Sequence, residues 1–176
     1  MKYNVLLLGS GGREHALAWK IARSPLLGEF YALPGNPGIN ALAKGVGGSA
    51  GDFDTVRRTV VDKHIDMVVC GPEDPLAGGL KDYLLSCPDV PSDLLFVGPG
   101  KDGARLEGSK DFAKEFMMRH GIPTADHLSV DATTIDKGFE FLESQKPPYV
   151  LKADGLAAGK GVLIVPDLDE AKEQLR

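Results

Sequence analysis

Cysteine is scarce in this sequence, since Cys70 and Cys87 are the only two among 176 residues. Two isolated thiols and four scattered histidines give no spacing typical of a zinc site and too little for a disulfide framework. No apolar run approaches the roughly 18 residues that span a bilayer, and the first residues lack the pattern of a signal peptide. We therefore expect a cytoplasmic chain with free thiols and no membrane partner.

Long runs of one charge are also missing. Lys and Arg together number 20 against 25 Asp and Glu, which leaves a net charge of −5. This balance argues against nucleic acid as a partner. The sequence has no internal repeat and no low-complexity segment, and its length is sufficient for one sizeable core or two small ones.

The first part of the chain alternates short apolar runs with helical patterns. The run 3–8, apolar apart from Asn4, suits a parallel strand buried on both faces, and the run 65–70, apolar apart from Asp66, is interpreted as the next buried strand. The expected strands are 3–8, 29–33, 65–70 and 94–97, and the expected helices lie before Ser24-Pro25, at 53–63 with Asp52 or Asp54 as cap, and at 76–85. The pattern predicts an α/β fold, a doubly wound and mostly parallel sheet, with a domain boundary near Lys101.

A glycine turn, residues 9–12, links the first strand to its helix. Such a turn opens a mononucleotide-binding unit, and the N-terminus of the helix is an anion site by its geometry. The dinucleotide fingerprint fails, because Glu14 stands at its third glycine position and the second strand ends in Pro34-Gly35-Asn36 without an acidic residue. We therefore do not expect a nicotinamide cofactor.

Two further loops of this domain are candidates for ligand contact. Glu73 follows the strand 65–70, at the edge where open sheets bind ligands, and the alternative is a solvated turn residue. Asp74 is interpreted as the N-cap of the helix 76–85. Residues 34–51 have few helix or strand signals and form either a ligand loop or a surface excursion.

The second part of the chain ends in a predicted hairpin. The strands 149–153 and 161–165 border the link 154–161, which contains three glycines and Lys160. Glycine lets the backbone come close to an anion and lysine adds positive charge, so we expect the link to bind phosphate. The alternative is a flexible hairpin without a ligand. The link is not a Walker A motif, which requires Ser or Thr after Gly-Lys. Lys152 points away from Tyr149 and Leu151 toward water, a negative partner or an exposed sheet edge.

The other elements of this part are mostly helical. We expect helices at 102–106, 110–120, 133–144 (capped around Asp131) and 168–175, and a strand at 127–130. In the helix 110–120, Phe112, Ala113, Phe116 and Met117 form the predicted buried stripe. Lys110 stands in its first turn, where the macrodipole disfavours a cation, which hints at function unless the side chain is merely exposed. The last helical pattern breaks off at Arg176, as if the chain were cut.

The sequence resembles the phosphoribosylamine–glycine ligases, a family of the ATP-grasp superfamily. The resemblance rests on LLLGSGGREHALAWK at the start, PGN at 34–36, GPEDPL at 71–76, FVGPGKDGARLEGSKDFAKEFMMRHGIPTA, and VLKADGLAAGKGV in the hairpin. It implies an N-terminal domain, 1–101, that binds phosphoribosylamine, and an incomplete ATP-grasp domain, 102–176. The latter consists of a helical linker, 102–123, and the start of a glycine-loop subdomain, 124–176.

The resemblance also implies site residues. Those expected to bind ATP are Lys110, Lys152, Asp154, Gly155, Leu156, Ala157, Ala158, Gly159, Lys160 and Gly161. Those expected to hold the phosphoribosylamine are Gly9, Ser10, Gly11, Gly12, Arg13, Glu14, Asn36, Gly71, Pro72 and Glu73. Catalytic residues and ligands for Mg²⁺ or Mn²⁺ are expected beyond Arg176, so the chain is expected to be an N-terminal fragment without turnover.

The implied reaction is the ATP-dependent ligation of glycine to 5-phosphoribosylamine through glycyl phosphate, a step of purine synthesis. It gives glycinamide ribonucleotide, ADP and phosphate, and a monomer acting on small molecules is expected. One alternative is a related ATP-grasp carboxylase or formyltransferase. Another is a non-catalytic module that binds a sugar phosphate or a nucleotide.

Overall fold

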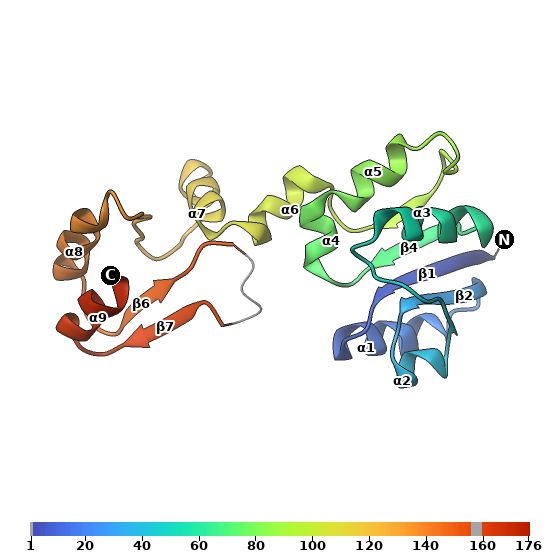
Figure 1. Cartoon of the computed structure of the whole chain (residues 1–176), viewed down its shortest axis with the longest axis horizontal. Coiled ribbons are helices and arrows are strands. Elements are labelled where there is room, and N and C mark those ends of the chain that lie inside the picture. The colour runs from blue at the N-terminus through green and yellow to red at the C-terminus, as the bar shows by residue number, and fades with distance from the viewer. Residues whose placement is uncertain (1, 156–159) are drawn as a thin grey trace. The chain divides into compact units, whose positions relative to one another are not determined.

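A computed structural model of the chain describes residues 2–155 and 160–176. The chain divides into two compact units, Met1–Arg105 and Leu106–Arg176 (Figure 1). No helix in the described ranges is both long and apolar enough to cross a membrane.

The first unit is built on a five-stranded sheet in which every paired strand runs parallel to its neighbour. Its spatial order is β3-β2-β1-β4-β5, so the first strand lies in the middle. The strands are β1 (Tyr3–Gly9), β2 (Leu27–Pro34), β3 (Lys44–Gly45), β4 (Met67–Cys70) and β5 (Leu95–Val97). This order places the chain reversal of a doubly wound sheet beside β1, which confirms the predicted fold class.

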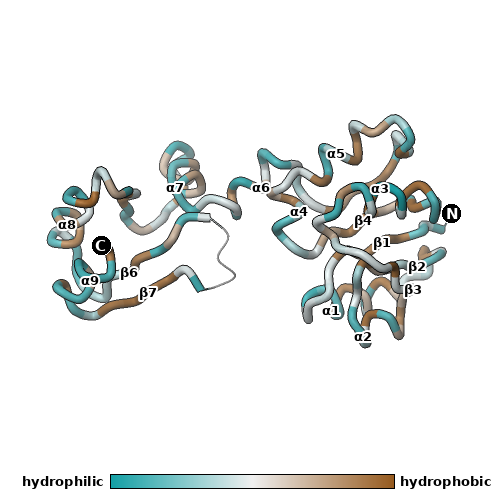
Figure 2. The backbone as a smooth tube through the Cα atoms, in the orientation of Figure 1, coloured by the Kyte–Doolittle hydropathy of each residue, from teal (hydrophilic) through white to brown (hydrophobic). Residues whose placement is uncertain are grey.

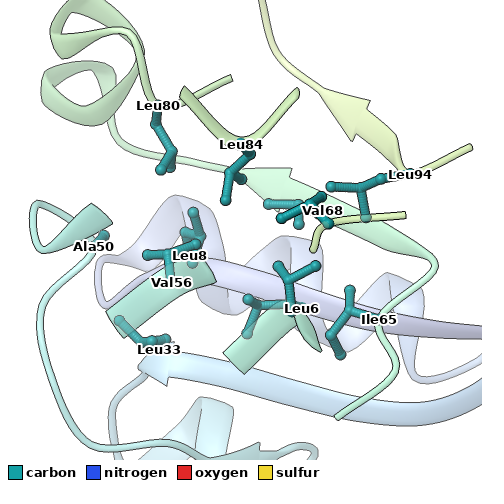
Figure 3. Packing of buried hydrophobic residues seen from close by; sticks show 12 residues of the cluster. Leu6, Leu8, Leu33, Ala50, Val56, Ile65, Val68, Leu80, Leu84 and Leu94 are labelled. Carbon is teal, nitrogen blue, oxygen red and sulfur yellow. The ribbon is translucent and has the colours of Figure 1, made fainter. Parts of the chain in front are cut away.

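Helices cover both faces of this sheet. They are α1 (Gly12–Ile21), α2 (Pro37–Asn40), α3 (Phe53–Asp62), α4 (Glu73–Gly78) and α5 (Leu80–Ser86). Alternate side chains of β1 belong to two different apolar clusters, because successive residues of a strand point to opposite faces of the sheet. Leu6 and Leu8 pack with side chains of α3 and α5, as Figure 3 shows. Val5 and Leu7 pack with Ala18 of α1 on the other face.

Two expectations for the first unit, both about the segment that follows β4, are wrong. The helix expected at 76–85 is two helices, because Gly79 adopts a left-handed conformation (φ +94°) between α4 and α5. Asp74 is therefore not an N-cap but the second residue of α4, which follows Pro72. The loop 34–51 contains α2 and the two-residue strand β3, both too short to leave a periodic signal in the sequence. Asp52 caps α3 as expected, since its carboxylate accepts a hydrogen bond from the Thr55 backbone N–H at 3.1 Å.

The second unit contains the predicted hairpin. Strands β6 (Tyr149–Lys152) and β7 (Val162–Val165) pair antiparallel, with Tyr149 opposite Val165. The helices of this part are α6 (Lys101–Gly108), which spans the point of division, α7 (Lys110–Arg119), α8 (Ile135–Ser144) and α9 (Leu168–Leu175). Its small apolar cluster joins Leu142 of α8 and Ala171 of α9 to the hairpin. Figure 2 shows the hydrophobic character of β7.

Two expectations for the second unit are also wrong. Residues 127–130 form no strand, because no described segment pairs with them. The stripe Phe112, Ala113, Phe116 and Met117 is only half-buried, and no residue of α7 is fully buried. The buried cluster of this unit is built instead by α8, β6, β7 and α9.

Leu6 tests the packing of the first unit, because none of its surface is exposed. Leu6→Ala leaves a cavity beneath the sheet and lowers the free energy of unfolding by about 2–5 kcal/mol. The matched control, Leu26→Ala, removes a side chain that is 55% exposed and changes stability by about 0.5 kcal/mol or less. Urea unfolding followed by circular dichroism measures both, and equal losses for the two variants would contradict the proposed packing.

Candidate functional site

Three loops meet at the carboxyl edge of the sheet in the first unit. The register pairs Gly9 of β1 with Pro34 of β2, and Leu8 of β1 with Cys70 of β4. The loops that follow these strands therefore lie side by side, at the edge where doubly wound sheets bind ligands. They border an open pocket of about 520 Å³.

Half of the substrate residues predicted from the sequence line this pocket. These are Gly9, Ser10, Gly11, Glu14 and Pro72, whereas Gly12, Arg13, Asn36, Gly71 and Glu73 are not among its lining residues. Other residues that line the pocket were not predicted as substrate contacts from the sequence, notably Ser49, Phe53, Asp74 and Gly78. Ser49 lies in the segment 34–51, whose length and glycine content were the one signal that could have indicated it.

Glu14 explains why three of these loop positions are glycine. Its carboxylate is buried, and Oε2 accepts a hydrogen bond from the Gly11 backbone N–H at 2.7 Å. A Cβ atom added at Gly9, Gly11 or Gly71 would lie 2.6, 2.8 or 2.4 Å from the Glu14 side chain. The expected anion at the N-terminus of α1 is thus supplied, at Gly11, by the chain itself.

Arg13 and Asn36 join the loops around the pocket. The Arg13 guanidinium donates to the Gly71 carbonyl at 3.1 Å and lies 3.9 Å from the Glu73 carboxylate. The Asn36 amide donates to the Ser10 carbonyl at 2.8 Å, while its oxygen accepts from the Ile39 backbone N–H at 2.9 Å. Both side chains therefore hold one loop against another.

Cys70 lies beneath the same edge. Burial, and to a smaller extent the nearby Glu14 carboxylate, raises the pKa of its thiol to about 12. The thiol donates to the Pro72 carbonyl at 3.4 Å. A thiol that stays protonated at neutral pH is a poor nucleophile, so we interpret Cys70 as a packing residue.

In the second unit, Asp154 attaches the end of the hairpin to the N-terminus of α7. Its Oδ1 accepts hydrogen bonds from the backbone N–H groups of Lys110 (2.6 Å) and Asp111 (3.3 Å). Its Oδ2 accepts from the Ser109 hydroxyl at 3.2 Å. Burial pushes the pKa of Asp154 upward, but these hydrogen bonds together outweigh it and hold the pKa below its ordinary value.

The lysines predicted to bind ATP have different surroundings. The Lys110 ammonium donates to the Gly155 carbonyl at 2.6 Å, which accounts for a lysine in the first turn of a helix. Lys152 is exposed on the face of β6 opposite Tyr149 and Leu151, as its place in the strand predicted. Its backbone pairs with Val162, but its ammonium group forms no ion pair with a described carboxylate.

Lys160 is also exposed. The carbonyl of Gly161 accepts from the Ala153 backbone N–H at 2.9 Å and closes the hairpin. The predicted ATP contacts at Leu156, Ala157, Ala158 and Gly159 lie outside the described residues.

These groups fit a polyphosphate better than a metal ion. The described part of the second unit offers three lysines on or beside the hairpin, and ammonium groups are suited to phosphate oxygens. No three His, Cys, Asp or Glu side chains among the described residues gather into a possible metal site.

Two family models match the chain in succession. The first is described as "Phosphoribosylglycinamide synthetase, N domain" and matches residues 3–107. The second is described as "Phosphoribosylglycinamide synthetase, ATP-grasp (A) domain" and matches residues 108–176. The two matches meet inside α6, near the division between the two compact units.

Curated relatives agree with these matches. A phosphoribosylamine–glycine ligase from Mesorhizobium japonicum is 49% identical over 172 residues, which are 98% of this chain and 39% of the relative. A trifunctional purine biosynthetic protein, adenosine-3, from Drosophila melanogaster is 45% identical over 97% of this chain and 13% of its own length. The chain thus spans well under half the length of these relatives.

Solved structures with a similar fold include a member of the same family. A crystal structure of a phosphoribosylamine–glycine ligase from Thermotoga maritima is 34% identical with a TM-score of 0.70, covering 97% of this chain and 38% of that one. An N5-carboxyaminoimidazole synthase from Aspergillus clavatus, in complex with ADP and 5-aminoimidazole ribonucleotide, has a TM-score of 0.73 over 99% of this chain and 44% of that one. At 21% identity, the latter likeness shows the fold alone.

Asp154→Asn tests the attachment of the hairpin to α7. The substitution keeps the shape but removes the charge that the N–H groups of Lys110 and Asp111 bind, so amide exchange at both residues accelerates about tenfold. Hydrogen exchange followed by NMR measures this, with Asp126→Asn, an exposed carboxylate, as the control. Unchanged exchange in Asp154→Asn would argue against the attachment.

The same contact has a pH dependence with a defined sign. Because the pKa of Asp154 is lower in the folded chain than its ordinary 3.8, its stabilising effect is complete above that pH and is lost as pH falls through the folded pKa. An NMR titration of the Asp154 carboxyl carbon checks that its midpoint lies below 3.8.

Proposed function

The chain belongs to the phosphoribosylglycinamide synthetase family, and on that premise we propose that it carries the sugar-phosphate-binding and ATP-phosphate-binding parts of a ligase. The proposed reaction joins glycine to 5-phosphoribosylamine at the expense of ATP, giving glycinamide ribonucleotide, ADP and phosphate. The observation that carries the proposal is the succession of the two family matches, residues 3–107 and 108–176. Relatives at 49% and 42% identity bear the name of this ligase, whereas carboxyaminoimidazole synthases of similar fold are 21% identical to the chain.

The first unit would supply the phosphoribosylamine site. The pocket lies where open α/β sheets bind ligands, between the loops that follow β1, β2 and β4. We assign substrate contact to the carboxyl end of β1 and to the loops and helix starts that follow β1, β2 and β4. The proposed contacts are Gly9, Ser10, Gly11, Gly12, Arg13, Glu14, Asn36, Gly71, Pro72 and Glu73.

The second unit would supply contacts to the ATP phosphates. Lys152 and Lys160 are exposed at the hairpin, and the Lys110 ammonium lies against the Gly155 carbonyl. Phosphoryl transfer needs mainly positioning and neutralisation of charge, which ammonium groups provide. Lys110 can exchange its carbonyl partner for a phosphate oxygen, which is the stronger acceptor because it is charged.

The chemistry of the proposed reaction explains the need for both units. A carboxylate is a poor electrophile, so the glycine carboxylate would first take the γ-phosphoryl group of ATP, forming glycyl phosphate and releasing ADP. The amine of phosphoribosylamine would then attack the carbonyl carbon, forming the amide and releasing phosphate. Bound Mg²⁺ or Mn²⁺ would supply neutralisation of the phosphate charge. Because no described cluster fits a metal, we assign the metal ligands and the catalytic residues to the additional length of the relatives.

We further propose the domain boundaries along the chain and the role of each domain. Residues 1–101 would form the substrate domain and residues 102–176 the first part of the ATP-grasp domain, with 102–123 as the helical linker and 124–176 as the start of the glycine-loop subdomain. The protein would act as a cytoplasmic monomer on small molecules.

Titration of the purified 176-residue chain with ribose 5-phosphate and with ATP tests the two assignments. Calorimetry is expected to give one site for the sugar phosphate and at least about tenfold weaker binding of ATP, because the first unit holds a formed pocket, while no cluster of described residues in the second unit fits the metal that accompanies ATP. Lys152→Ala should weaken the binding of ATP and leave the binding of ribose 5-phosphate unchanged. Lys20→Ala, on the exposed end of α1, should change the affinity for neither ligand. Binding of NAD in preference to both ligands would contradict the assignment.

Turnover by the same chain is a separate test. With ATP, glycine, and ribose 5-phosphate plus ammonia as the source of phosphoribosylamine, we expect no glycine-dependent release of ADP above the rate without protein. A coupled assay for ADP measures this. Release of ADP that requires glycine would show that the described residues include the catalytic groups that we assign elsewhere.

A further inference from the structure

The pocket of the first unit has an unexpected charge for a sugar-phosphate site. Its charged lining residues are Glu14 and Asp74, and none of its lining residues, all within the described ranges, is Lys, Arg or His. Ser10 and Ser49 add neutral hydroxyl groups. A phosphate inside this pocket would face two carboxylates without a compensating cation, which is electrostatically unfavourable.

Glu14 supplies the second observation. Only 6% of the residue is exposed, and its Oε2 is bound to the Gly11 N–H. Its Oε1 accepts no hydrogen bond from any described residue. A Cβ atom added at Gly71 would lie 2.4 Å from Oε1, so this oxygen is on the side of the carboxyl group that faces Gly71. Since Glu14 is one of the residues that line the pocket, Oε1 is its oxygen with unused capacity to accept a hydrogen bond from a ligand.

A cation lies next to the pocket but not in its lining. Arg13 precedes Glu14, and its guanidinium is held by the Gly71 carbonyl, one residue before Pro72 of the lining. Its contact with Glu73 is long, 3.9 Å, and 67% of the Arg13 side chain is exposed, so this ion pair is weak. A phosphate could replace the Glu73 carboxylate and bind the guanidinium in the bidentate way that arginine favours.

We propose that Glu14 is a specificity-determining residue that orients the substrate. The hydroxyl and amino groups of the ribosylamine enter the pocket, where Glu14 Oε1 accepts a hydrogen bond from the amine or the C1 substituent. The 5-phosphate stays outside the lining, beside Arg13. This inference rests on the proposed function and deepens it, because it states which end of the sugar phosphate the acidic pocket selects.

The orientation follows from the chemistry of the two ends. The amine at C1 donates hydrogen bonds and carries positive charge when protonated, and a carboxylate with a free oxygen is its best partner in a partly desolvated site. The 5-phosphate only accepts hydrogen bonds and needs a cation or N–H donors. At Gly11 the N–H donor is already occupied by Oε2.

Glu14→Gln is the decisive variant. Gln can still accept from the Gly11 N–H through its carbonyl oxygen, but it then presents an amide donor where Oε1 was. Calorimetry with ribose 5-phosphate, in the presence and absence of ammonia to form the phosphoribosylamine, should show that ammonia tightens binding at least about tenfold in the wild-type chain and not in Glu14→Gln. Asp62→Asn, an exposed carboxylate at the end of α3, should behave like the wild-type chain.

Arg13→Gln tests the other end of the substrate. The wild-type chain should bind ribose 5-phosphate at least about tenfold more tightly than ribose, and Arg13→Gln should lose most of that difference. Equal or tighter binding of ribose 5-phosphate plus ammonia by Glu14→Gln, or an unchanged preference for phosphate in Arg13→Gln, would overturn the orientation. If the wild-type chain binds no ribose 5-phosphate at millimolar concentration, the proposed function itself fails, and the inference with it.

An NMR measurement without any variant covers the case in which Glu14→Gln does not fold. Ribose should shift the amide signals of Ser10 and Gly11, whereas inorganic phosphate should shift the Arg13 Nε–H signal and leave the pocket amides in place. Stronger shifts of the pocket amides by inorganic phosphate than by ribose would overturn the proposal.

Discussion

Burial of the Glu14 carboxyl group at the carboxyl edge of the sheet is the contact on which the first unit's site depends. The group fills the space that a side chain would need at Gly9, Gly11 and Gly71, so two loops can close over it. Its hydrogen bond to Gly11 satisfies an N–H at the start of α1. The glycines at these positions therefore make room for a side chain of the protein itself. Because Glu14 also lines the pocket, it adds a negative charge there.

A related arrangement recurs in the second unit. Asp154 occupies the N-terminus of α7 and so attaches the end of β6 to that helix, with Lys110 bound to the adjacent Gly155 carbonyl. In both units a carboxylate from the chain takes a helix N-terminus near a glycine-rich segment. The positive charge available to a phosphate then comes from side chains, Arg13 in one unit and the lysines of the hairpin in the other.

The sequence predicts the fold well wherever a pattern is long enough to be periodic. The strand 3–8, the hairpin and the helix 168–175 appear within a residue or so of their expected bounds, and Lys152 lies on the exposed face as strand alternation requires. The predictions of secondary structure and burial are wrong where a tertiary contact or a single backbone dihedral angle determines the local structure. Strand β3 has two residues, α4 and α5 are separated only by the conformation of Gly79, and α7 buries less than its apolar stripe predicts.

The site is less predictable than the fold. The glycine turn and Glu73 lie at the edge of the sheet that carries the pocket, but Ser49 and Asp74 reach the pocket through the tertiary arrangement, which no local pattern encodes. Glu14 reads in the sequence as a departure from a dinucleotide fingerprint, and only the structure reveals that it is packed against three glycines.

A crystal structure of the chain with ribose 5-phosphate tests the central claim most directly, namely that the buried Glu14 carboxylate defines the ligand site. We predict the C1 hydroxyl within hydrogen-bonding distance of Glu14, with the phosphate beside Arg13 and the carboxylate still bound to Gly11. A phosphate seated at the N-terminus of α1, with the Glu14 side chain displaced from Gly11, would contradict the claim.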